Sequence, residues 1–161
     1  MLKPNLITNN ITDISVEYLK DNDIKALLLD VDNTLSIAHG NKTLRSGVAE
    51  WLSIMRENGI ELLILSNAKK KRTQRFGDSI GLDVIGLSMK PLPFGYLRAA
   101  KKLGIERKHI AMVGDQYFTD VLGARLSGMK SVMVTDITPE NDAFFKLKRR
   151  AEKNLLKRWA K

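Results

Sequence analysis

The stretch that decides the fold runs from Ile24 to Leu35 and reads IKALLLDVDNTL. Its first half is a short apolar run, typical of a parallel strand that is buried on both faces. Its second half places two carboxylates, Asp30 and Asp32, directly after that run. In open parallel sheets ligands bind beyond the carboxyl ends of the strands. The two aspartates are therefore the first candidates for a functional site.

Four more strand-like apolar runs follow the run at 24–29, at 61–65, 83–87, 109–113 and 131–134. The segments between them have apolar positions spaced near 3.6 residues, which predicts helices ended by glycines 59, 104 and 128. Strands that alternate with helices indicate a three-layer α/β domain with a central parallel sheet. We expect Ser46 to cap the first helix, and the apolar stripes to be Val48, Leu52 and Met55; Leu97, Ala100 and Leu103; and Val121, Ala124 and Leu126.

Length and composition limit the number of domains and the class of protein further. The 161 residues predict one domain over 1–161 with no cap domain. A composition of 43% hydrophobic and 28% charged residues excludes a fully disordered or fibrous chain. With no cysteine there is neither a disulfide nor a thiolate site. The N-terminus lacks the apolar core of a secretory signal, and no run approaches the ~20 residues of a membrane span. We therefore expect a cytoplasmic protein.

Further candidate residues follow the other strands. Asp115 comes directly after the run at 109–113 and its glycine, as Asp30 does after the first run, and Asp120 lies five residues further on. Such a carboxylate cluster in a basic protein calls for a cation, and Mg²⁺ prefers oxygen ligands. Ser66 and Asn67 follow the second run, where we expect a helix to begin, and a helix N-terminus binds phosphate groups. Taken singly, each of these residues could also be an ordinary helix cap.

The third run is followed by Lys90 and a proline. Together, the order Asp-x-Asp-x-Thr, Ser-Asn, Lys-Pro and Gly-Asp-x₄-Asp closely resembles the four motifs of the haloacid dehalogenase (HAD) superfamily. The segments 30–35, 90–95 and 114–120 look like those of the YqeG-type phosphatases of subfamily IIIA, a group with relatives that are phosphatidylglycerophosphate phosphatases. The resemblance covers nearly the whole chain and implies the Rossmann-like HAD fold.

The resemblance also implies a two-step phosphate transfer through an aspartyl-phosphate. Asp30 would be the nucleophile, and Asp32 would protonate the leaving oxygen and then activate water. Ser66, Asn67 and Lys90 would bind the phosphoryl oxygens, with Ser66 and Lys90 counted among the catalytic groups. The implied ligands of Mg²⁺ are Asp30, the main-chain carbonyl of Asp32, Asp115 and Asp120.

The net charge of +9 is concentrated in two segments. Residues 69–75 hold five basic residues and no acid, and residues 141–161 hold eight basic and two acidic residues. The second segment predicts a basic amphipathic helix at about 140–160, suited to an anionic membrane surface or to packing on the domain. Its apolar stripe would be Phe144, Leu147, Ala151, Leu155 and Trp159.

A site without a cap suits a phosphate that is presented by something large. We therefore expect phosphatidylglycerophosphate as substrate, with peripheral contact to the inner face of the membrane. A soluble sugar or nucleotide phosphate is the catalytic alternative. A non-catalytic module that binds RNA or protein is a second alternative, and an aromatic content of only 6% argues against nucleic acid as a partner.

Overall fold

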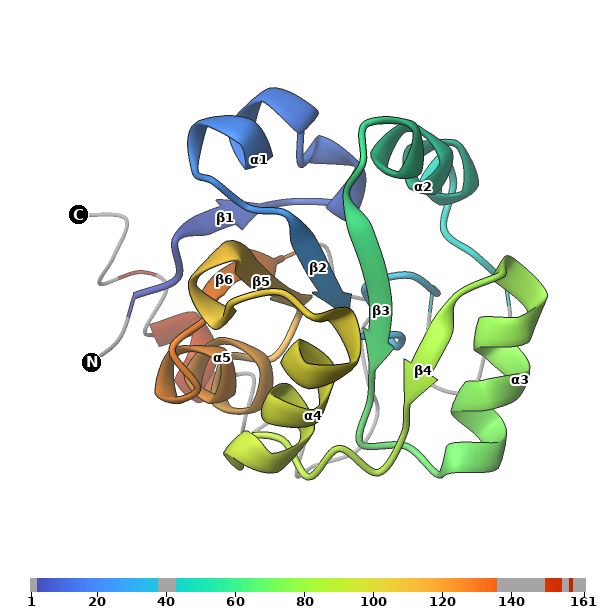
Figure 1. The fold of residues 1–161 in the computed structure, drawn as a ribbon. Coiled ribbons are helices and arrows are strands. Elements are labelled where there is room, and N and C mark those ends of the chain that lie inside the picture. The colour runs from blue at the N-terminus through green and yellow to red at the C-terminus, as the bar shows by residue number, and fades with distance from the viewer. Residues whose placement is uncertain (1–2, 38–42, 136–149, 155–156, 158–161) are drawn as a thin grey trace.

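A computed structural model describes residues 3–37, 43–135, 150–154 and 157 of the chain. Within them, six strands form a single parallel sheet in the order β1-β6-β5-β2-β3-β4 (Figure 1). All neighbouring pairs of strands are parallel, as the buried apolar runs predict. The strands are β1 (Leu6–Thr8), β2 (Ala26–Leu29), β3 (Glu61–Leu65), β4 (Asp83–Ile85), β5 (Ile110–Gly114) and β6 (Lys130–Val134).

Helices cover both faces of this sheet. In β2 the side chains alternate, because successive residues of a strand point to opposite faces. Leu27 and Leu29 pack in one apolar cluster with residues of α1, α2 and α3, whereas Leu28 packs in a second cluster with residues of α4 and α5. The predicted three-layer arrangement is thus confirmed. The helices are α1 (Val16–Asp21), α2 (Val48–Glu57), α3 (Lys70–Ile80), α4 (Pro93–Leu103) and α5 (Leu122–Leu126), with helical turns η1 (Ile11–Asp13), η2 (Arg107–His109) and η3 (Tyr117–Val121).

The order of the strands creates a switch point next to β2. From β2 the chain runs outward to β3 and β4, then crosses back to form β5 on the other side of β2. The connections at the carboxyl ends of β2 and β5 therefore separate in opposite directions and leave a crevice, where ligands of open α/β sheets bind. The site described below lies at this point.

Several local predictions were wrong. The sequence does not predict the edge strand β1, because three residues, two partly buried and one exposed, are too few to give a periodic signal. The capping residue of α2 is Gly47, in a left-handed conformation and without a side-chain cap, rather than Ser46. Leu97 and Leu126 are exposed, although both belong to predicted apolar stripes. The cause is the orientation of the helices, since α4 turns Tyr96 toward the sheet instead.

The predicted C-terminal helix lies mostly outside the described residues, Phe144, Leu147, Leu155 and Trp159 among them. Residues 150–154 are helical, but there Ala151 is exposed and Glu152 is buried, which is the reverse of the predicted stripe. In the described part of the chain, no separate folded unit interrupts the connections that follow β2 and β3. None of the helices found there has the length and apolar character needed to cross a bilayer.

Candidate active site

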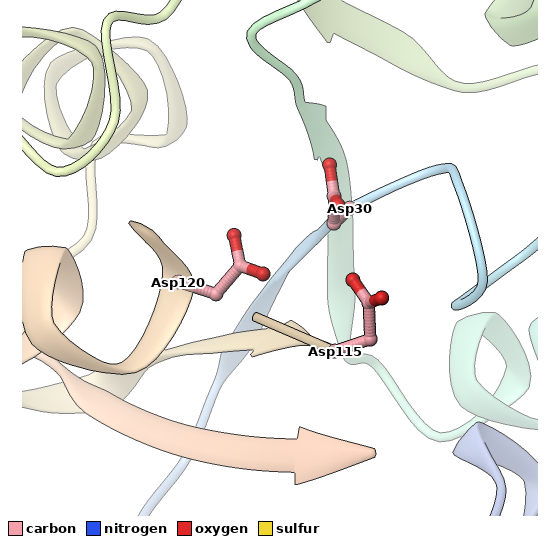
Figure 2. Close-up of side chains that lie close together, drawn as sticks. All are labelled: Asp30, Asp115 and Asp120. Atoms are coloured by element: carbon pink, nitrogen blue, oxygen red, sulfur yellow. The ribbon is translucent and has the colours of Figure 1, made fainter. Parts of the chain in front are cut away.

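Three buried carboxylates converge at the carboxyl edge of the sheet. Asp30, Asp115 and Asp120 each offer an oxygen, and these oxygens lie within 4.8 Å of one another. Figure 2 shows that the side chains come from three different segments and surround a common space. Asp115 and Asp120 are fully buried and Asp30 is 7% exposed. The prediction that these acids cluster is therefore met by the geometry.

The local sequence explains why they meet. Asp30 follows β2 and Asp115 follows β5, and these two strands are paired, with Leu29 opposite Val113. Asp120 arrives from the next helical turn, η3, where its Oδ2 accepts a hydrogen bond of 3.0 Å from the main-chain N–H of Gln116. Gly114 is needed at the end of β5, because a Cβ at this position would collide with the Asp120 carboxylate. One glycine thus allows the acids of two segments to approach.

Lys90 lies between two of the carboxylates. Its Nζ donates to Asp30 Oδ1 at 2.9 Å and to Asp120 Oδ1 at 2.7 Å, and to the carbonyl oxygen of Leu65 at 3.0 Å. The side chain is 2% exposed. Burial by itself lowers the pKa of this ammonium, but Asp120 and Asp30 outweigh that effect and leave the pKa above its usual value. Lys90 thus places a buried ammonium between two of these acids at the carboxyl edge of the sheet.

The acids outnumber this cation. Burial raises the pKa of Asp30 to about 6, Lys90 opposes the rise, and the nearby charge of Asp120 adds to it. The three buried acids bring carboxylate oxygens within 4.8 Å of one another, where their negative charges would repel at a high cost because burial removes water. A divalent cation with a preference for oxygen ligands would compensate them. The donor set thus fits Mg²⁺.

Asp32 lies beside this cluster and has a different partner. Its Oδ1 accepts a hydrogen bond of 2.6 Å from Nη2 of Arg72, which is in the first turn of α3. The Asp32 carboxylate is not part of the three-acid cluster. Sequence reasoning placed Arg72 only within a basic run, because nothing in the local pattern connects it to a residue forty positions earlier.

Ser66 and Asn67 do not begin a helix, so that prediction was wrong. The helix α3 starts at Lys70, and Ser66 Oγ instead accepts a 3.1 Å hydrogen bond from the N–H of Ala68 in the preceding turn. Ser66 is buried at the end of β3, next to the carbonyl of Leu65 that receives Lys90. The hydroxyl is therefore near the crevice, but the N-terminal amides of α3 lie further along the chain.

The side chain of Asn67 is engaged with the neighbouring loop. Its Oδ1 accepts hydrogen bonds from Ser88 Oγ at 2.9 Å and from the main-chain N–H of Lys90 at 2.7 Å. Its Nδ2 donates to the main-chain carbonyl of Lys90 at 2.9 Å. Asn67 was predicted to bind substrate, and the structure gives its side chain these protein partners. The geometry fits a residue that positions Lys90.

Tyr96 is a further support that the sequence did not reveal. It is fully buried in α4, and its hydroxyl donates to the main-chain carbonyls of Thr119 at 2.7 Å and Asp120 at 3.3 Å. These bonds hold the turn η3 that carries Asp120. A lone tyrosine in a helical pattern gives no signal of such a contact.

Comparison with known proteins identifies the family. The model of the haloacid dehalogenase-like hydrolases matches residues 36–128, more than half of the chain. The chain belongs to the haloacid dehalogenase-like hydrolases. The match begins after Asp30 and Asp32. The family model therefore does not cover these two residues, and only the geometry described above places them at the site.

Two curated proteins and one solved structure extend this result. The chain is 28% identical to "Probable phosphatase YqeG" of Bacillus subtilis, over 95% of this chain and 88% of that protein. It is 27% identical to a mitochondrial phosphatidylglycerophosphatase of Saccharomyces cerevisiae, over 84% of this chain and 79% of that protein. A putative HAD hydrolase of subfamily III A from Legionella pneumophila matches in fold, with a TM-score of 0.59 and 23% identity over 75% of this chain and 70% of its own. The predicted superfamily, fold class and phosphatase type are thus confirmed.

Proposed function

We propose that this HAD hydrolase cleaves phosphomonoesters through a phosphorylated Asp30. The observation that carries the proposal is the convergence of Asp30, Asp115, Asp120 and Lys90 at the switch point of the sheet, with Asp32 two residues from Asp30. Phosphoryl transfer needs mainly positioning and electrostatic stabilisation, and this arrangement supplies both.

In the first step an oxygen of Asp30 forms a bond to phosphorus while the ester P–O bond breaks. Asp32 gives its proton to the leaving alcohol oxygen. In the second step a water oxygen attacks the same phosphorus, the bond to Asp30 breaks, and Asp32 takes the proton of the water. The ammonium of Lys90 stays within hydrogen-bond distance of Asp30 and stabilises the phosphoryl oxygens, and Ser66 contributes its hydroxyl at the edge of the crevice.

Mg²⁺ is the proposed cofactor. Asp30, Asp115, Asp120 and the main-chain carbonyl of Asp32 would hold it. When bound, the ion would neutralise charge on the phosphoryl group and orient it. The fit rests on the three carboxylate oxygens that the buried acids bring within 4.8 Å of one another.

The proposed substrate is phosphatidylglycerophosphate at the inner face of an anionic membrane. The similarity to the yeast phosphatidylglycerophosphatase supports it. An active-site edge without an inserted folded unit in the described residues also supports it, because a lipid headgroup fixed in a bilayer needs open access. The competing proposal is a soluble sugar or nucleotide phosphate.

Two assays test the function. With Mg²⁺, the protein should hydrolyse a generic aryl phosphate, Asp30→Asn should abolish the activity, and the exposed Asp83→Asn should leave it unchanged. Retention of activity in Asp30→Asn would exclude the proposed nucleophile, and a wild-type protein without activity would favour a binding module. Phosphatidylglycerophosphate in mixed micelles should then be cleaved faster than a panel of soluble phosphates. A preference for the soluble panel would refute the lipid substrate.

A further inference from the structure

An exposed apolar surface lies next to the candidate active site. Among the described residues, nine large apolar side chains are exposed, and five of them fall between positions 87 and 97. We call these five the apolar rim, and they are 42% to 56% exposed. Clustered exposure of this kind marks an interaction site, whereas single exposed apolar residues are ordinary. The apolar rim consists of Leu87, Met89, Leu92, Phe94 and Leu97.

The backbone holds these side chains outward. In the loop after β4 the polar residues Ser88 and Lys90 are buried, while the apolar residues beside them, Leu87 and Met89, are exposed. Both exposed residues have a left-handed backbone, with φ of 48° and 57°. Such a conformation is unfavourable for side chains of this kind and persists only where the surroundings enforce it.

Hydrogen bonds to the neighbouring loop enforce it here. The N–H of Leu87 donates to the carbonyl of Ala68 at 3.0 Å, and the N–H of Ser88 donates to the carbonyl of Ser66 at 3.0 Å. The side chains of Ser88 and Asn67 add a bond of 2.9 Å. The inverted pattern, polar inside and apolar outside, is therefore built into the same contacts that position Lys90.

A basic row borders the apolar rim. Lys69, Lys70 and Lys71 are exposed at the start of α3, and the first turn of that helix holds no acid. Gly86, next to the rim, packs so closely on this turn that a Cβ would lie 2.8 Å from the Cα of Lys70. Positive charge at a helix N-terminus opposes the helix dipole, so these lysines do not serve the stability of α3.

The apolar rim and Lys69–Lys71 lie at the same end of the molecule as the candidate active site, where the carboxyl ends of the strands are. In Figure 1 the loop from β4 to α4 and the start of α3 are at the same end as the tips of β2 and β3. A surface that combines leucine, methionine and phenylalanine with lysines matches the boundary between acyl chains and anionic headgroups. A second copy of this chain would bring its own lysines against these, and like charges repel.

We propose that the apolar rim and Lys69–Lys71 dock this protein on an anionic phospholipid bilayer, with the mouth of the active site toward the headgroups. The apolar side chains would enter the headgroup boundary and the lysines would contact the lipid phosphates. This inference rests on the proposed function in one respect, because the bilayer would also present the substrate. Docking itself requires no catalysis and is measured separately.

The experiment is cosedimentation of the full chain with vesicles. Vesicles that contain roughly one third phosphatidylglycerol should bind the protein, vesicles of phosphatidylcholine alone should bind it at least about tenfold less, and added salt should weaken the binding. Phe94→Ser combined with Leu97→Ser should lower the binding to the anionic vesicles by about tenfold or more. Lys70→Gln combined with Lys71→Gln should also lower it.

The matched control exchanges two apolar residues elsewhere that are at least as exposed on average, Ile54→Ser with Leu126→Ser. This control should bind vesicles like the wild type. Equal binding by the control and by the Phe94/Leu97 variant would overturn the proposal. So would a Phe94/Leu97 variant that loses only self-association in sedimentation velocity, because the rim would then be an interface between copies.

The two proposals fail in different ways. If docking is right, the Phe94/Leu97 variant keeps its activity on a soluble aryl phosphate within about twofold and loses activity on lipid in vesicles. If the wild type binds anionic vesicles through the rim but cleaves no phospholipid, the docking surface stands and the lipid substrate is refuted.

Discussion

The buried ammonium of Lys90 makes a quantitative prediction for stability. Lys90→Met leaves the carboxylates of Asp30 and Asp120 without the cation that they share. The pairs are buried, since the Lys90 side chain is only 2% exposed. Removing one partner of a buried charge pair typically costs about 3–5 kcal/mol. For a domain of this size each kcal/mol corresponds to about 2–4 °C in Tm. The expected loss is therefore about 6–20 °C without divalent metal.

The chain provides a matched control. Lys102 Nζ lies 3.0 Å from Asp83 Oδ2, nearly the same distance as Lys90 from Asp30, but the two side chains are 47% and 72% exposed. An exposed pair contributes about 0–1 kcal/mol, so Lys102→Met should lower Tm by no more than about 4 °C. The two variants thus compare the same chemistry at two degrees of burial.

The assay is thermal unfolding followed by circular dichroism, with EDTA and then with saturating Mg²⁺. Mg²⁺ should raise the Tm of Lys90→Met more than that of the wild type, because the ion supplies the missing positive charge. A loss in Lys90→Met no larger than in Lys102→Met would refute the reasoning that burial makes the difference. A Tm that Mg²⁺ leaves unchanged in both proteins would refute the proposed metal site.

Three further predictions concern the residues around the site. Asn67→Ala removes three hydrogen bonds to residues 88–90, so kcat on an aryl phosphate should fall by about 10- to 100-fold with little change in KM; a rise in KM alone would instead indicate direct contact with substrate. Gly114→Ala should displace Asp120 and raise the Mg²⁺ concentration for half-maximal activity by about tenfold or more; unchanged metal dependence would exclude Asp120 as a ligand. Arg72→Gln removes a partner of the Asp32 carboxylate, in a pair whose side chains are 47% and 12% exposed, so the free energy of unfolding should fall by roughly 1–3 kcal/mol, between the values for exposed and buried pairs, and kcat should fall because Asp32 loses its orientation; an unchanged kcat would contradict that role.

Much of the fold and of the site could be predicted because strand ends are local features. A buried apolar run marks a parallel strand, and the residue that follows it must lie at the carboxyl edge of the sheet. Asp30, Asp115 and Lys90 can be placed at one edge of the sheet in this way from the sequence alone. The pairing of β2 with β5, and the turn that carries Asp120, then bring the side chains together.

The supporting contacts could not be predicted in this way. Arg72 reaches Asp32 over forty positions of sequence, and Tyr96 reaches the main chain of residues 119 and 120. Each depends on the relative placement of a helix and a loop, which apolar periodicity does not encode. The edge strand β1 could not be predicted for the same reason. Its three residues form a strand because they pair with β6, which lies far away in the sequence.

The sequence by itself therefore determined the type of fold, the edge at which the site lies and the acids that gather there. It also predicted apolar helix faces, but only the tertiary structure decided which side of each helix meets the sheet. Leu97 was assigned to the core and lies in the apolar rim, because α4 uses Tyr96 and Ala99 against the sheet. Periodicity fixes the spacing of side chains along a helix, whereas the packing of helix on sheet fixes which of them remain exposed.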